Sequence, residues 1–159
     1  MKVICIGYRK MNSIFNSDLE LSLRILLTLY TSDKELNVDE ILLSDFITVY
    51  SFEFGLDNSN LHGINEFSYS ELAARREQFI SAIKTLALNK YIIFTVNSSG
   101  FSYKISELGE STCDSMTTDY AFAYINSSIR AHEYMNNKTT TELLTYINQM
   151  AMKKKQEAL

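Results

Sequence analysis

Hydrophobic positions follow a helical period over most of this chain. Residues 19–30 are apolar on nearly every side, a pattern typical of a helix buried at the centre of a fold. Apolar residues recur at helical spacing over 38–50 and again over 72–87, which predicts two further helices. Each segment is preceded by a serine or asparagine with a glutamate three residues later, the pattern of a capping box. These cap residues are Ser17, Asn37 and Ser68.

The period changes to that of a strand after residue 90. Residues 91–96 are β-branched or aromatic, residues 97–100 have the composition of a turn, and residues 101–105 alternate between apolar and polar. Three helices followed by a hairpin is the order of a winged helix-turn-helix. We therefore predict a mainly α fold with a small β-hairpin: a winged helix-turn-helix-like domain plus C-terminal helices.

Helical patterns continue after the hairpin. Ser106 is placed to cap a short helical segment within 107–117, and residues 120–135 form a second amphipathic segment. Thr139 opens a final helix with another capping box.

These patterns divide the chain into three expected parts. Residues 1–11 are an N-terminal strand or leader, residues 12–110 form the winged-helix-like domain, and residues 111–159 form a C-terminal helical extension. Met1 and Met11 both remain open as the true start.

Composition narrows the possible partners. Hydrophobic residues make up 46% of the chain and charged residues 21%, which is typical of a globular protein. Residues 18–77 contain twelve acids against four bases, whereas strong nucleic-acid binders have dense basic surfaces. We expect DNA contact only weakly, or indirectly through a complex. No apolar run approaches the ~20 residues that cross a bilayer, so we expect a cytoplasmic protein without a membrane partner.

Residue patterns for catalysis are not evident in the sequence. The chain has no glycine-rich phosphate loop, and its histidines, His62 and His132, lie far apart. Cys5 and Cys113 lack the CxxC spacing of a metal site. We expect no cofactor, no metal and no catalytic residue. His62, in a polar loop over 51–69, is either an acid–base group or metal ligand, or a packing histidine, which we favour; His132 should be exposed.

Three arginines within the predicted helices are candidates for specific contacts. Arg24 lies in the middle of the first helix, where it either reaches out to solvent or pairs with an acid. Arg75 and Arg76 lie in the third helix, which reads DNA in winged-helix proteins. Glu71 and Glu77 flank them and weaken their attraction to phosphate. The alternative is pairing with acids of this chain or of a partner.

A profile of spaced residues over about 12–110 resembles a known family. The residues are Phe15-Asn16-Ser17, Leu21, Leu23-Arg24-Ile25-Leu26, Asp39, Ile41, Asp45-Phe46, Leu61-His62, Glu71-Leu72, Arg75-Arg76, Leu86, Asn89-Lys90-Tyr91-Ile92, Gly100-Phe101-Ser102-Tyr103 and Ser106-Glu107-Leu108-Gly109. They resemble the middle component of ABC three-component systems, the small subunit of Lamassu-type defence operons. A proline that is common shortly after the histidine in that family is missing here.

The resemblance implies a non-catalytic adaptor in an anti-phage or anti-plasmid complex. Its partners would be a coiled-coil ATPase of the SMC type and an effector, often a nuclease, which the adaptor would keep inactive until foreign DNA is sensed. The expected partner contacts are Phe15, Asn16, Arg24, His62, Arg75, Arg76, Leu143, Ile147 and Met150.

Several alternatives stay open at this point. Phe15 is either a contact or a hydrophobic staple that packs on the first helix. The stripe of Leu143, Ile147 and Met150 packs either on the core or on a coiled coil of the ATPase. A winged-helix transcription regulator and an enzyme built on His62 are the competing functions.

Overall fold

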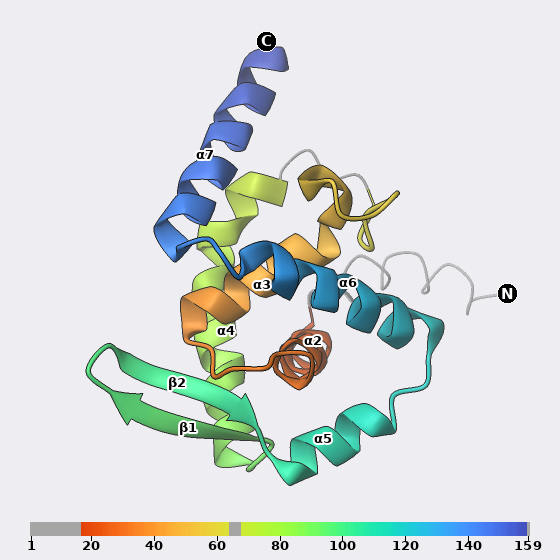
Figure 1. Cartoon of the computed structure of the whole chain (residues 1–159), viewed down its shortest axis with the longest axis vertical. Coiled ribbons are helices and arrows are strands. Elements are labelled where there is room, and N and C mark those ends of the chain that lie inside the picture. Colours follow the sequence, from red (N-terminus) through yellow and green to blue (C-terminus); the bar gives the residue numbers. More distant parts are fainter. Residues whose placement is uncertain (1–16, 64–67, 159) are drawn as a thin grey trace, which may run out of the picture.

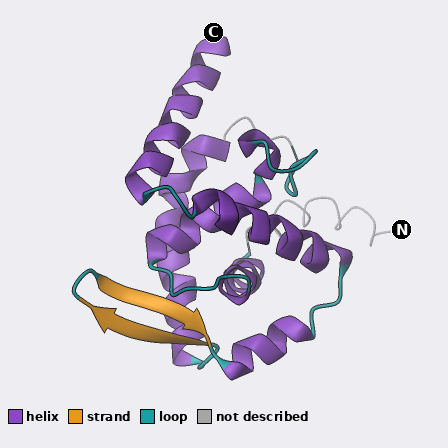
Figure 2. Ribbon diagram, in the orientation of Figure 1, coloured by secondary structure: helices purple, strands orange, loops and turns teal. Residues whose placement is uncertain are grey.

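The fold consists mainly of α-helices with one small hairpin, as predicted (Figures 1 and 2). A computed structural model describes residues 17–63 and 68–158. The elements are α2 (Asp18–Tyr30), α3 (Val38–Val49), the 3₁₀ helix η1 (Ser51–Phe54), α4 (Ser68–Leu88), β1 (Ile92–Asn97), β2 (Gly100–Ile105), α5 (Glu107–Asp114), α6 (Asp119–Met135) and α7 (Thr140–Glu157). Among the described residues, no helix is both long and apolar enough to cross a membrane.

Helix starts follow the predicted caps. The Ser17 hydroxyl accepts a hydrogen bond from the Glu20 amide at 3.2 Å. Asn37 and Thr139 each form a complete capping box with the glutamate three residues later. Ser106 caps α5, as expected. The side chain of Ser68 lies outside the described part of the chain.

The core surrounds α2, which is seen end-on near the middle of Figure 1, with α6 above it and α5 below it. Most of α2 is buried, including Ile25 and Leu26, so the helix predicted to be central is central. The same apolar cluster takes in side chains from α3, α4, α6 and α7, for example Tyr124 and Ile147.

The hairpin joins the helices as a wing. β1 and β2 pair antiparallel from Ile92 opposite Ile105 to Asn97 opposite Gly100. Leu36, in the connection between α2 and α3, exchanges two backbone hydrogen bonds with Tyr103 of β2 and acts as a one-residue third strand. Three helices followed by a hairpin is the winged-helix-like order that the sequence predicts, and the short strand at Leu36 is an addition to it.

The polar loop predicted over 51–69 is more ordered than expected at its start. Ser51–Phe54 forms η1, and both end residues of η1 are buried. Phe54 packs edge-on against Phe46 of α3 and Tyr134 of α6, with ring centroids 6.2 and 5.7 Å away. Aromatic contacts therefore hold the start of this connection to two helices, which the polar composition did not indicate.

Gly109 allows α5 to lie against the base of the hairpin. A β-carbon at this position would lie 2.6 Å from Cγ1 of Ile105 and would also collide with the backbone oxygen of Tyr91. We expect Gly109→Ala to lower the free energy of unfolding in urea by about 1–3 kcal/mol despite alanine's better helix propensity. Glu110→Ala, an exposed control on the same helix, should stay within about 0.5 kcal/mol. Equal urea midpoints for the two variants would contradict this prediction, because α5 would then shift away from the hairpin without losing stability.

Candidate functional site

A buried ion pair joins α2 to α3. Arg24 is 1% exposed and Asp45 is 3% exposed. Arg24 Nε donates to Asp45 Oδ1 at 2.9 Å, and its Nη2 donates to the other carboxylate oxygen. The pairing with an acid that the sequence left open is therefore confirmed. Because its guanidinium is buried, Arg24 is not on the surface of the described chain.

α6 completes this network through Tyr124. The Tyr124 hydroxyl donates to Asp45 Oδ1 at 2.7 Å and lies 2.8 Å from Thr28 Oγ1 of α2. Burial alone would raise the pKa of Asp45, but the charge of Arg24 and the hydrogen bonds from Arg24 and Tyr124 hold it below its usual value. Burial and the Asp45 charge raise the pKa of Tyr124. The network therefore stays ionised at Arg24 and Asp45 and fixes three helices to each other.

His62 lies at the edge of the network. Its Nε2 is 2.8 Å from the Tyr120 hydroxyl, and its ring stacks on that of Tyr120 with centroids 6.1 Å apart. Burial, followed by the positive charge of Arg24, lowers the pKa of His62 to about 4. The ring is therefore neutral at pH 7 and acts as a packing group, the interpretation that the sequence favours.

Among the described residues, neither histidine belongs to a group of side chains that could bind a metal ion. Within the described residues, no group of three or more histidine, cysteine, aspartate or glutamate side chains could hold a metal ion. Cys113 is buried, and burial raises its pKa to about 12, so its thiol is inert at neutral pH.

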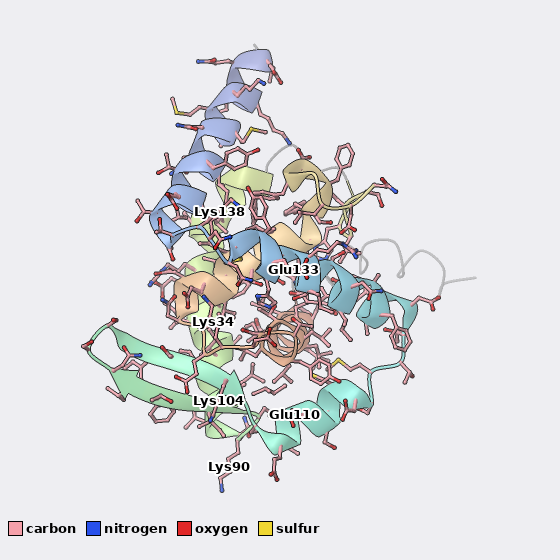
Figure 3. The ribbon with its side chains drawn as sticks, viewed as in Figure 1. Lys34, Lys90, Lys104, Glu110, Glu133 and Lys138 are labelled. Carbon is pink, nitrogen blue, oxygen red and sulfur yellow. The ribbon has the colours of Figure 1, made fainter. Side chains whose placement is uncertain are left out.

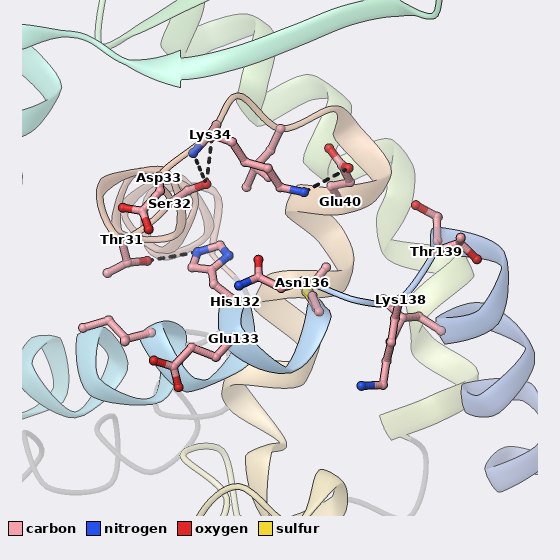
Figure 4. A pocket seen from close by; sticks show the side chains of 15 residues that line it. Thr31, Ser32, Asp33, Lys34, Glu40, His132, Glu133, Asn136, Lys138 and Thr139 are labelled. Atoms are coloured by element: carbon pink, nitrogen blue, oxygen red, sulfur yellow. Dashed lines mark hydrogen bonds and ion pairs between the residues drawn. The ribbon is translucent and has the colours of Figure 1, made fainter.

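His132 is half-buried, so the expectation that it is exposed was wrong. Its Nε2 lies 3.0 Å from the Thr28 backbone oxygen and 3.1 Å from Thr31 Oγ1, so it is half-buried against α2. It lines a cavity of about 440 Å³ between the α2–α3 connection, the end of α6 and the start of α7 (Figure 4). Both lysines (Lys34 and Lys138) and acids (Asp33, Glu40 and Glu133) line this cavity, so it does not select one charge.

α4 presents the surface that would read DNA in a winged helix. Arg76 Nε donates to Asp39 Oδ1 of α3 at 2.8 Å, so this arginine pairs with an acid of the same chain. Arg75 is half-buried. The hairpin turn between Asn97 and Gly100 carries no base. Lys84 is an exposed base of α4, but with Arg76 paired and no base in the hairpin turn, this surface lacks the dense positive charge that binds phosphate.

The predicted stripe of the last helix faces inward. Leu143 and Ile147 are buried in the core, and Met150 is half-buried against it. Of the two possibilities, core packing is the one observed. The C-terminal turns of α7 extend beyond the rest of the ribbon (Figure 1), where Lys154 pairs with Glu53 at 3.3 Å. Phe15 and Asn16 lie outside the described residues.

The hairpin carries an apolar surface that was not among the predicted contacts. Phe94, Val96 and Phe101 are 54%, 65% and 54% exposed, and the two phenylalanine rings lie 5.8 Å apart. Lys104 of β2 and Lys90, labelled in Figure 3, are the nearest bases along the chain. Residues 91–94 are all apolar or aromatic, whereas a strand with one face in water should alternate. That missing alternation is the signal that indicates this surface.

Comparison with known proteins identifies the family. No curated protein and no solved structure matches the chain significantly. The sequence model of one family, described as ABC-three component (ABC-3C) system Middle Component 2, matches residues 14–157, nearly the whole chain. The match extends through α5, α6 and α7, beyond the region of the resemblance noted in the sequence. The chain therefore belongs to the family of ABC-three component system Middle Component 2.

Proposed function

We propose that this chain is a non-catalytic adaptor of a bacterial anti-phage or anti-plasmid defence complex. It holds a coiled-coil ATPase of the SMC type and an effector, often a nuclease in such systems, in one assembly. Membership of a middle-component family supports the proposal because a middle component implies two other components.

The apolar hairpin is the observation that carries the proposal. A wing that contacts DNA needs lysine or arginine, because affinity for a duplex comes mainly from phosphate contacts. Here the turn of the wing carries no base, and beside the single lysine of β2, Lys104, the wing exposes Phe94, Val96 and Phe101. Exposed aromatic and branched side chains gathered on one element are typical of protein–protein contacts. The geometry therefore favours a protein partner at the wing over a nucleic acid.

Co-expression of the three components tests the adaptor directly. With a tag on the effector, we expect the ATPase to be recovered only when this chain is present. Effector and ATPase expressed without this chain provide the control. Equal recovery of the ATPase with and without this chain would contradict the bridging role.

Duplex binding separates the adaptor from a winged-helix regulator. We expect the isolated chain to bind a labelled duplex only weakly in fluorescence anisotropy, even at low salt, because Arg76 is paired and the wing has no basic tip. Tight binding that weakens steeply with added salt would favour the regulator instead.

A further inference from the structure

Hydrogen bonding by Tyr103 fixes which backbone groups of the hairpin point outward. Its N–H and C=O both bond to Leu36, so they point away from β1. Tyr103 lies opposite Phe94, and paired residues in an antiparallel ladder alternate between bonded and non-bonded pairs. Phe94 therefore directs its own N–H and C=O away from β2. By the same alternation, Ile92 and Val96 do so too, whereas Ile93 and Thr95 bond to β2.

β1 consequently has a free edge. Within the described chain, β2 is flanked on both sides, by Leu36 and by β1, whereas β1 pairs only with β2. No backbone partner is found in that part of the chain for the outward groups of Phe94 and Val96. Protein edges are usually protected by charges, prolines or bulges. β1 has neither charge nor proline, and its register with β2 is continuous.

The free edge and the apolar surface lie together. Opposite residues in a ladder share a face, so Phe94, Val96 and Phe101 all project from the same face of the hairpin. The outer half of this face is exposed, whereas its inner end, at Ile92, is buried in the core. An added strand would therefore gain backbone hydrogen bonds from the edge and an apolar contact from one face.

We propose that the free edge of β1 accepts an extended segment of another component of the same system, which pairs with it as an additional strand. This inference rests on the proposed adaptor function and names the surface that serves it. Pairing with Ile92, Phe94 and Val96 requires a segment of about five residues. The segment should be apolar at the alternate positions that lie beside Phe94 and Val96, and tolerant of polar residues beside Ile93 and Thr95.

The size of the surface favours another component over a second copy of this chain. The exposed parts of Phe94, Val96 and Phe101 on one face and of Ile93 on the other amount to roughly 400 Å² of side-chain area, since a whole aromatic side chain buries 150–250 Å². Two copies paired through β1 would bury about 800 Å² in total, below the ~1,200 Å² of stable interfaces. A component held by other contacts within the assembly can use a small edge of this kind.

Amide hydrogen exchange at single-residue resolution tests the pairing. The full chain is compared alone and in the co-expressed complex with the ATPase and effector. We expect the amides of Phe94 and Val96 to exchange quickly in the isolated chain and at least about tenfold more slowly in the complex. The amides of Ile93 and Thr95, which already bond to β2, should be slow in both samples and provide an internal control.

A proline at the edge adds a second, independent test. Val96→Pro removes an outward N–H without removing a bond to β2, because edge strands tolerate proline at such positions. We expect it to lower recovery of the complex at least tenfold. Val96→Thr keeps the amide and the branched shape, and should retain the complex. Urea unfolding of both variants confirms that they fold.

The outcomes are distinguishable. A complex in which the Phe94 and Val96 amides stay unprotected would overturn the strand pairing and leave the adaptor function intact. If protection of these two amides in the isolated chain grows with protein concentration, the edge binds a second copy of the chain. If the two amides are protected at every concentration, the chain covers its own edge. Either result would overturn the inference. Failure of the three components to associate would overturn the adaptor function, and the inference with it.

Discussion

Replacing Arg24 by methionine should destabilise the fold by roughly 3–5 kcal/mol, because the Asp45 carboxylate then stays buried without its cation. Arg24 supplies two hydrogen bonds and the charge that keeps the pKa of Asp45 low. After the substitution, only Tyr124 among the observed side-chain donors still bonds to that carboxylate. Equilibrium unfolding in urea, followed by circular dichroism, measures the loss.

Two control variants make this prediction specific. Lys84→Met removes an exposed cation from α4 and should change stability by no more than about 0.5 kcal/mol. Arg24→Met combined with Asp45→Leu removes both charges and should recover a large part of the loss, because no unpaired charge remains. If Arg24→Met were no more destabilising than Lys84→Met, the ion pair would be accessible to water and the buried network would be wrong.

Because Arg24 is buried, its substitution is a poor test of partner contacts. Arg24 is one of the residues on which the family resemblance was based, and we expected it to be a partner contact. Its side chain is 1% exposed, so substitution acts first on the fold. A loss of assembly in Arg24→Met would therefore parallel the loss of folded protein. Val96 and Phe94, which are largely exposed, can be changed with less effect on the core.

Local patterns predicted most of the secondary structure. Caps such as Asn37 and Thr139 involve residues three apart in sequence, so the sequence contains both partners of the interaction. The switch to a strand period near residue 90 is similarly local, and the observed hairpin follows it. Interactions between residues that are close in sequence can therefore be predicted without knowledge of the fold.

Contacts between distant segments were not predictable in this way. Asp45 lies 21 residues from Arg24 and 79 residues from Tyr124, and many other acids in the chain were possible partners. His132 was misplaced for a related reason. It bonds to the Thr28 carbonyl and the Thr31 hydroxyl of α2. The polar residues Thr28 and Thr31 at the end of α2 gave no indication that they would pack against α6.

Lowering the pH from 7.5 to 5 should destabilise the protein by about 2 kcal/mol through His62, at about 1.4 kcal/mol per pKa unit. Its pKa falls from 6.5 to about 4 on folding, because burial and then the charge of Arg24 disfavour the protonated ring. Between these two values the unfolded chain binds more protons than the folded chain. The free energy of unfolding therefore falls as the pH falls through this window.

Other groups titrate nearby, so the contribution of His62 must be isolated. The pKa of His132 is also lowered, mainly by burial, which adds to the loss at low pH. The pKa of Glu20 is raised, mainly by burial, so Glu20 acts in the opposite direction. His62→Gln removes the titration and keeps an amide that can bond to the Tyr120 hydroxyl. The difference between this variant and the original chain cancels the other groups.

We expect the His62→Gln chain to lose about 2 kcal/mol less than the original chain between pH 7.5 and pH 5 in urea unfolding. NMR titration of the His62 ring protons gives the folded-state pKa directly. Equal losses in both chains, with a ring pKa near 6.5, would mean that water reaches the imidazole. The contact with Tyr120 would then not hold residue 62 against α6, and a surface role for His62 would regain support. A ring pKa near 4 would instead mean that His62 packs this connection onto the charged core.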